Sequence, residues 1–251
     1  MSFFKTPLRF YMKDGANSAF KDWLFKLFDL YKVNHEDSSI FASDNIIATG
    51  RNLGFLREKR FVDLANMYFH DDEVHGAIIW RIHVLSWAIN YCKNLDGDLI
   101  EFGCYDAIVA RFLVDYCNLE KTTKNFFLYD VFDNPPKFKG PKHSSELYGE
   151  VKKMFSDKKF VKVVKGLLPE SFIKNGPDKI SFVHLDLNEA NAELEILKII
   201  FDRLVKGGII ILDDYGWSGY KEQHNKERDF FNDKNHQIME LPTGQGLIIK
   251  N

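Results

Sequence analysis

The sequence predicts an α/β fold: a doubly wound, mostly parallel seven-stranded sheet of the Rossmann-like type, finished by an antiparallel C-terminal strand and preceded by a helical extension. From Leu95 onward, short apolar runs typical of strands alternate with longer amphipathic runs typical of helices. Near the end, only a tight turn, TGQG, separates QIMELP from LIIK. Such a turn permits an antiparallel hairpin and is too short for a crossover connection.

Residues 1–94 are predicted to form a helical lead-in, and residues 95–251 the main domain. A helix is expected from Ala19 to Val33, and the polar stretch from Asn34 to Asp44 is expected to be a loop. Two further helices are expected in REKRFVDLANMYF and GAIIWRIHVLSWAINYC. Core packing is the expected role of the stripe formed by Phe20, Trp23, Leu24, Leu27, Phe28 and Tyr31 in the first helix.

In the main domain, the expected strands are DLIEFG, NFFLYDVF, FVKVVKG, KISFVHLDL and IIILDD, followed by the hairpin. Helices are expected in IVARFLVDYC, LPESFIKN and KEQHNKERDFFNDKN, and from Asn191 to a Gly-Gly stop at Gly208. The stretch from Asp133 to Glu146 is rich in proline and lysine and is expected to be a loop, a candidate lid or anion contact.

Composition narrows the function classes. A chain of 251 residues, 45% hydrophobic, suits one globular domain with a small subdomain. A net charge of −2 indicates no nucleic-acid surface. Three cysteines without metal-like spacing favour a reduced, cytoplasmic protein. The N-terminus lacks the apolar core of a signal peptide, and no stretch approaches the roughly 18 apolar residues of a membrane helix.

Acidic residues follow four of the five strands that precede the hairpin. In open α/β sheets, ligands bind outside the carboxyl ends of the strands. An acid at one strand end is often a helix cap or a loop anchor, but four together favour a ligand with hydroxyls, a positive charge or a metal ion. The acids are Glu101, then Asp130 and Asp133, then Asp186 and Glu189, then Asp213 and Asp214.

The turn after the first strand, EFGCYDA, lacks the G-x-G-x-x-G pattern that binds a pyrophosphate. This argues against NAD and favours a cofactor without phosphates, such as S-adenosyl-L-methionine. Asp130 would accept hydrogen bonds from the ribose hydroxyls, and Glu101 would favour the positive amino and sulfonium groups. The alternative for Glu101 is a structural hydrogen bond to loop backbone.

Asp186, Asp213 and Asp214 follow two strands that, as neighbours, would bring three carboxylates together. A hard divalent cation such as Mg²⁺, Mn²⁺ or Ca²⁺ would remove their repulsion. The alternative is that one aspartate caps the following helix and the other pairs with a lysine.

The chain resembles class I S-adenosylmethionine-dependent methyltransferases, and is most similar to the macrocin O-methyltransferase family. The likeness rests on NLGFLREKRF, WRIHVLSWA, GDLIEFG, FLYDVF, HLDLN, KGGIIILDDYGWSG and LPTGQGLIIK. It implies that Asp186, Asp213 and Asp214 bind magnesium. The cofactor residues expected from the resemblance and the strand ends together are Glu101, Gly103, Tyr105, Asp130, Phe132, Gly166, Leu167 and Asp186.

Two positions depart from the family pattern. Ala107, preceded by Asp106, stands where the family has glycine, and a methyl group and a charge there could alter cofactor affinity. Leu187-Asn188 follows Asp186 where macrolide-type members often have Gly-Asp, which leaves the general base and the sugar contacts open.

The predicted reaction is displacement of the sulfonium methyl group by a hydroxyl of a sugar or related small molecule, activated by a bound cation and a general base. The expected catalytic residues are His143 and Glu189, with His83 a further candidate base. The alternative class is a non-catalytic or inactive α/β protein, for example one that binds a sugar nucleotide. The aromatic N-terminal helices could provide a homodimer surface.

Overall fold

The computed structural model describes residues 9–10, 19–27, 40–133 and 142–251. The chain divides into two compact units, Met1–His83 and Val84–Asn251, and the division falls inside helix α4 (Ile79–Cys92). The second unit contains a seven-stranded sheet and the residues predicted to form the site. Within the part of the chain that the model describes, none of the helices has the length and apolarity that a membrane span requires.

The sheet confirms the predicted α/β architecture. Its order is β5-β4-β3-β6-β7-β9-β8, with β9 antiparallel to both neighbours and the other pairs parallel. The chain builds outward from β3 in one direction, then returns and builds from β6 in the other, so the β3–β6 boundary is the topological switch point. The strands are β3 (Asp98–Phe102), β4 (Phe126–Asp130), β5 (Val161–Lys165), β6 (Ile180–Leu185), β7 (Leu204–Leu212), β8 (Met239–Glu240) and β9 (Gly246–Ile249).

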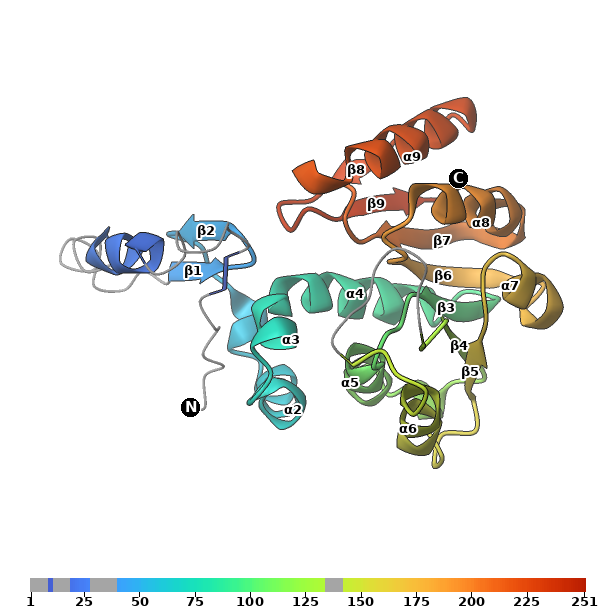
Figure 1. Cartoon of the computed structure of the whole chain (residues 1–251), viewed down its shortest axis with the longest axis horizontal. Helices are drawn as coiled ribbons and strands as arrows, with labels where there is room; N and C mark the ends of the chain where they lie inside the picture. The colour runs from blue at the N-terminus through green and yellow to red at the C-terminus, as the bar shows by residue number, and fades with distance from the viewer. Residues whose placement is uncertain (1–8, 11–18, 28–39, 134–141) are drawn as a thin grey trace. The chain divides into compact units, whose positions relative to one another are not determined.

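Helices cover both faces of the sheet, with α5 and α6 on one side of the strands and α7 and α8 on the other (Figure 1). The central strands are therefore largely apolar, with Glu101 on β3 and His184 on β6 as exceptions, and every residue of β6 is buried. The helices of this unit after α4 are α5 (Ile108–Tyr116), α6 (Leu147–Met154), α7 (Glu170–Asn175), α8 (Ala190–Arg203) and α9 (Lys221–Asp233), with short 3₁₀ turns η2 (Leu119–Lys121) and η3 (Ser218–Tyr220).

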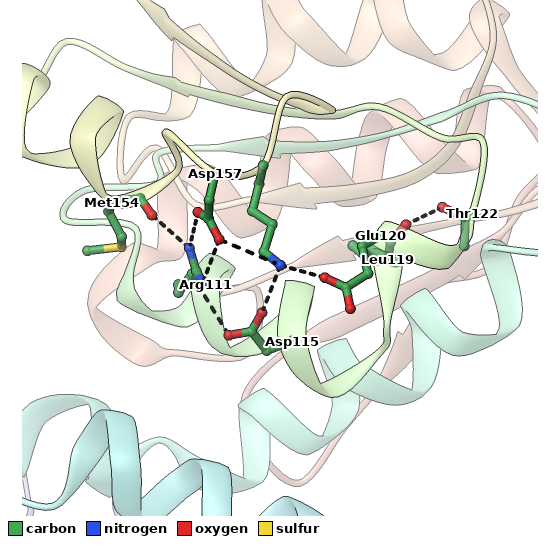
Figure 2. A network of polar contacts seen from close by, with 8 residues as sticks. Arg111, Asp115, Leu119, Glu120, Thr122, Met154 and Asp157 are labelled. Atoms are coloured by element: carbon green, nitrogen blue, oxygen red, sulfur yellow. Dashed lines mark hydrogen bonds and ion pairs between the residues drawn. The ribbon is translucent and has the colours of Figure 1, made fainter.

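An ion-pair network fastens α5 to the segment between α6 and β5. Arg111 donates to the Met154 carbonyl, to Asp157 and to Asp115 (Figure 2). Lys158 extends the network, since its Nζ lies 3.7 Å from Asp157 and 4.0 Å from Asp115 and bonds to Glu120. The network therefore stabilises the packing of α5 and η2 against the segment after α6. None of its residues is one of the predicted site residues.

The predicted helix from Asn191 to Gly208 is wrong at its end. Helix α8 stops at Arg203, and Leu204 is already extended and pairs with Ile180 as the first residue of β7. The Gly207-Gly208 pair lies inside this strand, at an irregularity between the pairs Ile180–Leu204 and Phe182–Ile209. Gly207 has a φ of 80°, which a bulged strand position accommodates most easily as glycine.

The first unit contains an unpredicted hairpin and several short helices. Its elements are β1 (Ile40–Ser43), β2 (Ile46–Thr49), the 3₁₀ turn η1 (Gly54–Leu56), α2 (Lys59–Phe69) and α3 (Glu73–Ala77), after a helix over residues 19–27. The expectation of a loop up to Asp44 is wrong, because Ile40–Ser43 pairs with Ile46–Thr49. Asp44 and Asn45 both have positive φ, as a tight hairpin turn requires.

The predicted aromatic stripe of the N-terminal helix is buried only in part. Leu24 is buried, but Trp23 and Leu27 are exposed, so the expectation of core packing is wrong for these two residues. Phe28, Tyr31 and the rest of the predicted helix to Val33 lie outside the described residues.

Candidate active site

His184 joins two acidic residues at the switch point of the sheet. Glu101 on β3 and His184 on β6 are register partners, so their side chains lie on the same face. The Nδ1 atom of His184 lies 2.8 Å from Oε1 of Glu101, and its Nε2 atom lies 3.3 Å from Oδ1 of Asp213. All three side chains are buried. The imidazole therefore connects the Glu101 carboxylate on β3 to the Asp213 carboxylate, which directly follows β7.

This arrangement stabilises the charged form of the histidine. Burial by itself lowers the pKa of His184, but the hydrogen bonds to Asp213 and Glu101 and the negative charges of both carboxylates together outweigh that effect and raise the pKa to about 10. At neutral pH, His184 is thus an imidazolium that partly neutralises the two carboxylates. It cannot serve as a general base there, since a base must be unprotonated.

Among the described residues of the second unit, one group of side chains could bind a metal ion. Ligand atoms of His184, Asp186 and Asp213 all lie within 4.8 Å of one another. Asp186 and Asp213 are therefore brought together, as their positions after adjacent strands suggested. Asp214 is not a member of this group, and His184 takes its place.

The donor set fits a hard divalent cation. Two carboxylates are sufficient for Mg²⁺, which usually keeps several waters and binds through one or two carboxylates. Asp213 is held in place by Nε2 of Gln245, which donates to its Oδ1 at 2.9 Å. Asn188 similarly donates to Oδ1 of Asp186 at 2.9 Å. The two ring nitrogens of His184 already face Glu101 and Asp213, so Asp186 and Asp213 are the residues that would hold a cation.

The turn after β3 requires a glycine at position 103. Gly103 has a φ of 86°, and a Cβ atom there would lie 1.8 Å from the backbone oxygen of Asp186. The turn therefore lies directly against the residue that follows β6. The second carboxylate oxygen of Glu101, Oε2, is buried and has no hydrogen-bond partner among the described residues. It is an acceptor that a positively charged ligand group could use.

Asp130, at the end of β4, anchors two loops. Its Oδ2 accepts a hydrogen bond from the backbone N–H of Tyr105 at 2.8 Å, and its Oδ1 accepts one from Phe132 at 2.7 Å. The Nε2 atom of His143 lies 3.5 Å from Oδ1, and the His143 and Tyr105 rings lie 4.8 Å apart. These residues thus form one cluster at the turn after β3. Each oxygen of a carboxylate can accept a second hydrogen bond, which leaves room for a ribose hydroxyl.

The remaining predicted cofactor residues differ in exposure. The Phe132 side chain is fully buried against Tyr148, so any cofactor contact there would come from its backbone. Gly166, after β5, donates its N–H to the Asp130 carbonyl at 3.1 Å. Leu167 is 59% exposed and offers an apolar surface beside that turn.

Asp106 and Ala107, which depart from the family pattern in the turn after β3, are both accommodated within the protein. Asp106 accepts the Ile108 N–H at 3.2 Å, at the start of α5, and pairs with Nζ of Lys142 at 2.6 Å. Ala107 is left-handed, with a φ of 55°, and its methyl group is buried. The Asp106 charge is therefore paired, and the Ala107 methyl does not face a ligand. Lys137 and Lys139, two lysines of the loop that is expected to contact an anion, lie outside the described residues.

Glu189 and His83, the candidate general bases besides His143, both contact other residues of the protein. Glu189 caps α8, since its Oε2 accepts the Ala192 N–H at 2.8 Å. His83, in the first unit, stacks on Phe55 with ring centroids 4.3 Å apart, and burial lowers its pKa. Neither residue belongs to the His184 group.

His184 is the site residue that sequence reasoning missed. The signal was a histidine in the otherwise apolar strand ISFVHL, two residues before Asp186 and therefore on the same face of the strand. An ionisable side chain in a fully buried strand needs a partner. Glu101 is that partner, but only the β3–β6 register reveals it.

Known methyltransferases share this fold. The calicheamicin methyltransferase CalS11 aligns with a TM-score of 0.61 over 99% of this chain and 98% of its own, at 11% identity. The O-methyltransferase NovP aligns with a TM-score of 0.57 over 69% of this chain and 80% of its own, at 16% identity. The Podospora anserina methyltransferase PaMTH1, solved with bound S-adenosylhomocysteine, aligns with a TM-score of 0.55 over 92% of this chain and 96% of its own, at 13% identity. At such identities the alignments establish the fold.

Strand order, the antiparallel β9 and the acidic switch point define a class I S-adenosylmethionine-dependent methyltransferase. The family model "Macrocin-O-methyltransferase (TylF)" matches residues 81–240, which is more than half of the chain. The chain therefore belongs to the macrocin O-methyltransferase family, and it is an S-adenosylmethionine-dependent O-methyltransferase. A comparison with curated proteins gave no significant match.

Proposed function

We propose that this enzyme methylates a hydroxyl group of a sugar or related small molecule, in surface-glycan or natural-product biosynthesis, with the help of Mg²⁺ or Mn²⁺. The sugar acceptor is supported by the family, whose name refers to the macrolide macrocin, and by CalS11, described as a TDP-rhamnose 3'-O-methyltransferase. The observation that carries the metal part of the proposal is the approach of Asp186 to Asp213 at the switch point.

Asp186 and Asp213 are the proposed metal-binding residues, with Asp214 beside them as the third carboxylate predicted from the sequence. A bound divalent cation would lower the pKa of an acceptor hydroxyl and fix its direction of attack. His184 and Gln245 hold the Asp213 carboxylate from the protein side. The buried, charged His184 also keeps Glu101 in place at the cofactor turn.

The cofactor is proposed to lie along the turns after β3, β4 and β5. Glu101 would accept a hydrogen bond from its amino group, and Asp130 one from its ribose. The unpartnered Glu101 Oε2 supports the first contact, and the spare acceptor capacity of Asp130 supports the second. The wider set proposed to surround the cofactor is Gly103, Tyr105, Phe132, Gly166, Leu167 and Asp186.

The proposed general base is His143. It is buried, and its Nε2 atom lies 3.5 Å from Oδ1 of Asp130, beside the turn that is proposed to hold the cofactor. Glu189 is the second candidate, and its role as the cap of α8 makes it the less available of the two.

The experiment that tests the proposal is calorimetric titration of S-adenosyl-L-methionine with and without Mg²⁺, followed by turnover assays in EDTA. We expect cofactor binding in both conditions and loss of turnover in EDTA. Asp213→Ala should abolish metal-dependent turnover and leave cofactor binding within about threefold of wild type. The exposed Asp233→Ala on α9 is the matched control.

Three results would contradict the proposal at different points. Absence of cofactor binding in either condition would exclude the methyltransferase activity. Turnover unaffected by EDTA would exclude only the metal role. Equal loss of cofactor binding and turnover in Asp213→Ala would make Asp213 a structural residue.

A cytoplasmic location and a homodimer complete the proposal. All three cysteines are free and buried, which supports a reducing compartment. Trp23 and Phe25 are about half exposed on the helix over residues 19–27, which supports a second copy of the chain as the partner. Light scattering during size-exclusion chromatography would give the oligomeric state.

A further inference from the structure

Asp186 is held in place by the residue two positions further on. Asn188 donates from its side-chain Nδ2 to Oδ1 of Asp186 at 2.9 Å. Asn188 has a φ of 56°, a left-handed conformation that asparagine adopts more readily than most residues. The position of the Asp186 carboxylate therefore depends on what fixes the backbone of the short loop between β6 and α8.

Glu193 fixes that backbone. Its Oε1 accepts hydrogen bonds from the N–H groups of Leu187 at 2.9 Å and Asn188 at 3.2 Å. Glu193 lies in the first turn of α8, and its side chain is fully buried. The N-terminus of α8 already has its own cap in Glu189. The Glu193 side chain is therefore not needed as the helix cap, and its Oε1 atom binds the backbone of the loop that contains Asn188.

A second buried carboxyl group holds Glu193 from behind. Glu227 of α9 is 1% exposed and lies close enough to Glu193 that its charge, after burial, contributes to raising the pKa of Glu193. This contact also joins α8 to α9. Glu193 therefore lies between the loop after β6, which its Oε1 contacts, and the buried carboxyl group of Glu227.

We infer that Glu193, backed by Glu227, is a positioning residue for Asp186 and acts through Leu187, Asn188 and the Asn188 side chain. The inference rests on the proposed function, in which Asp186 binds the cation. Residues that orient a metal ligand from behind typically change metal affinity 10- to 100-fold when removed. Glu193 would thereby set the affinity of the site without touching metal, cofactor or acceptor.

The test measures Mn²⁺ binding directly, from the electron paramagnetic resonance signal of the free ion, together with the melting temperature of each variant. Glu193→Ala removes the acceptor for both backbone N–H groups, and we expect Mn²⁺ affinity to fall at least about tenfold. Glu193→Gln keeps a carbonyl oxygen at the same position and should restore affinity to within about threefold of wild type. The control is Glu195→Ala, an exposed glutamate of the same helix that pairs with Lys198.

A second variant tests the route. Asn188→Gly removes the side-chain amide while tolerating the positive φ, and should weaken Mn²⁺ binding about as much as Glu193→Ala. If both act through the same contact, the double variant should be no weaker than the more affected single variant. Full additivity of the two effects would overturn the route through Asn188.

The remaining outcomes distinguish failure of the Glu193 inference from failure of the proposed metal role. Wild-type Mn²⁺ affinity in a folded Glu193→Ala variant, or equal losses in Glu193→Ala and Glu193→Gln, would overturn the inference while the proposed function stands. Absence of Mn²⁺ binding by the wild-type enzyme would overturn the proposed metal role and this inference together.

Discussion

At the scale of single residues, His184 explains how acidic side chains coexist at the end of a buried sheet. Its imidazolium lies between Glu101 and Asp213, so the protein itself supplies one positive charge. The carboxylates of Glu101, Asp186 and Asp213 carry three negative charges against the one positive charge of His184, which leaves an excess of two negative charges. One divalent cation would balance that excess, which is why the histidine complements the proposed metal site.

Replacing His184 by Gln should strongly destabilise the fold. The change removes the positive charge and leaves two buried carboxylates facing each other, and breaking a buried ion pair on one side typically costs about 3–5 kcal/mol. Urea unfolding in EDTA, so that no cation compensates, measures the free energy of unfolding. His70→Gln, on an exposed histidine, should have no measurable effect. A loss equal to that control would mean that the His184 charge contributes nothing to stability.

Replacing Ala107 by Gly should stabilise the enzyme. A non-glycine residue in the left-handed region costs about 1–2 kcal/mol, and glycine removes that cost at the price of a more flexible unfolded chain. We expect a net gain of about 0.5–1 kcal/mol in the free energy of unfolding. Because the Ala107 methyl is buried, S-adenosyl-L-methionine affinity should stay within about twofold, measured by calorimetry.

The control for this change is Ala110→Gly, a buried residue with ordinary helical geometry three positions along α5. At this helical position glycine relieves no strain and only makes the unfolded chain more flexible. The free energy of unfolding should therefore fall by about 1 kcal/mol. A fall in stability for Ala107→Gly as well would show that the left-handed conformation carries no cost at this turn.

At the scale of elements, the Glu193–Glu227 pair makes the packing of α8 on α9 depend on pH. Burial raises the pKa of Glu227 to about 7, and burial together with Glu227 raises the pKa of Glu193 well above its usual range. Both groups bind protons more tightly in the folded state than in the unfolded chain. The free energy of unfolding should therefore fall as the pH rises from about 4.5 to 7, and more slowly beyond.

Glu227→Gln should remove much of this fall. The amide stays neutral at every pH, so the variant should be more stable than wild type at pH 8 and no more stable at pH 4.5. Urea unfolding at the two pH values gives the difference. Glu222→Gln, on an exposed glutamate of the same helix, should follow the wild-type profile. Parallel profiles for wild type and Glu227→Gln would contradict the assignment.

Most elements of the second unit could be predicted from the sequence because hydrophobic periodicity and turn length are local signals. The alternation from Leu95 onward and the tight TGQG turn are sufficient for the parallel sheet and its antiparallel end. The α8–β7 boundary was wrong because Leu204 fits either the apolar face of a helix or a buried strand, and its pairing with Ile180 decides between them. The β1–β2 hairpin was missed because Asp44-Asn45 is a weaker turn signal than the glycine-containing pairs.

The sequence allows prediction of those site residues that directly follow the strands. Asp186 and Asp213 could be expected to meet because they follow neighbouring strands. His184 and Glu193 could not be assigned in the same way, since the partner of each is set by tertiary register: Glu101 across the β3–β6 pair, and Glu227 across the contact of α8 with α9.

At the scale of the whole molecule, the proposed ligand site draws on both halves of the sheet. Glu101 and Asp130 come from the half built outward from β3, whereas Asp186 and Asp213 come from the half built from β6. A ligand that contacts both halves binds only when the sheet is formed. Binding should therefore stabilise the fold as a whole, by an amount that rises with the logarithm of the ligand concentration once the site is saturated.

S-Adenosylhomocysteine should raise the melting temperature of the enzyme. At about 100 times its dissociation constant, a ligand specific for the folded state adds about 2.7 kcal/mol. For a protein of this size, each kcal/mol corresponds to roughly 2–4 °C, so we expect a rise of roughly 5–11 °C in a thermal-shift measurement. NAD is the control and should give no rise, because the EFGCYDA turn lacks the glycines that a pyrophosphate needs. Mn²⁺ should add a further rise in wild type and none in Asp213→Ala, where the rise caused by S-adenosylhomocysteine should persist. An equal rise with NAD, or none with S-adenosylhomocysteine, would contradict the assignment of the cofactor to this turn.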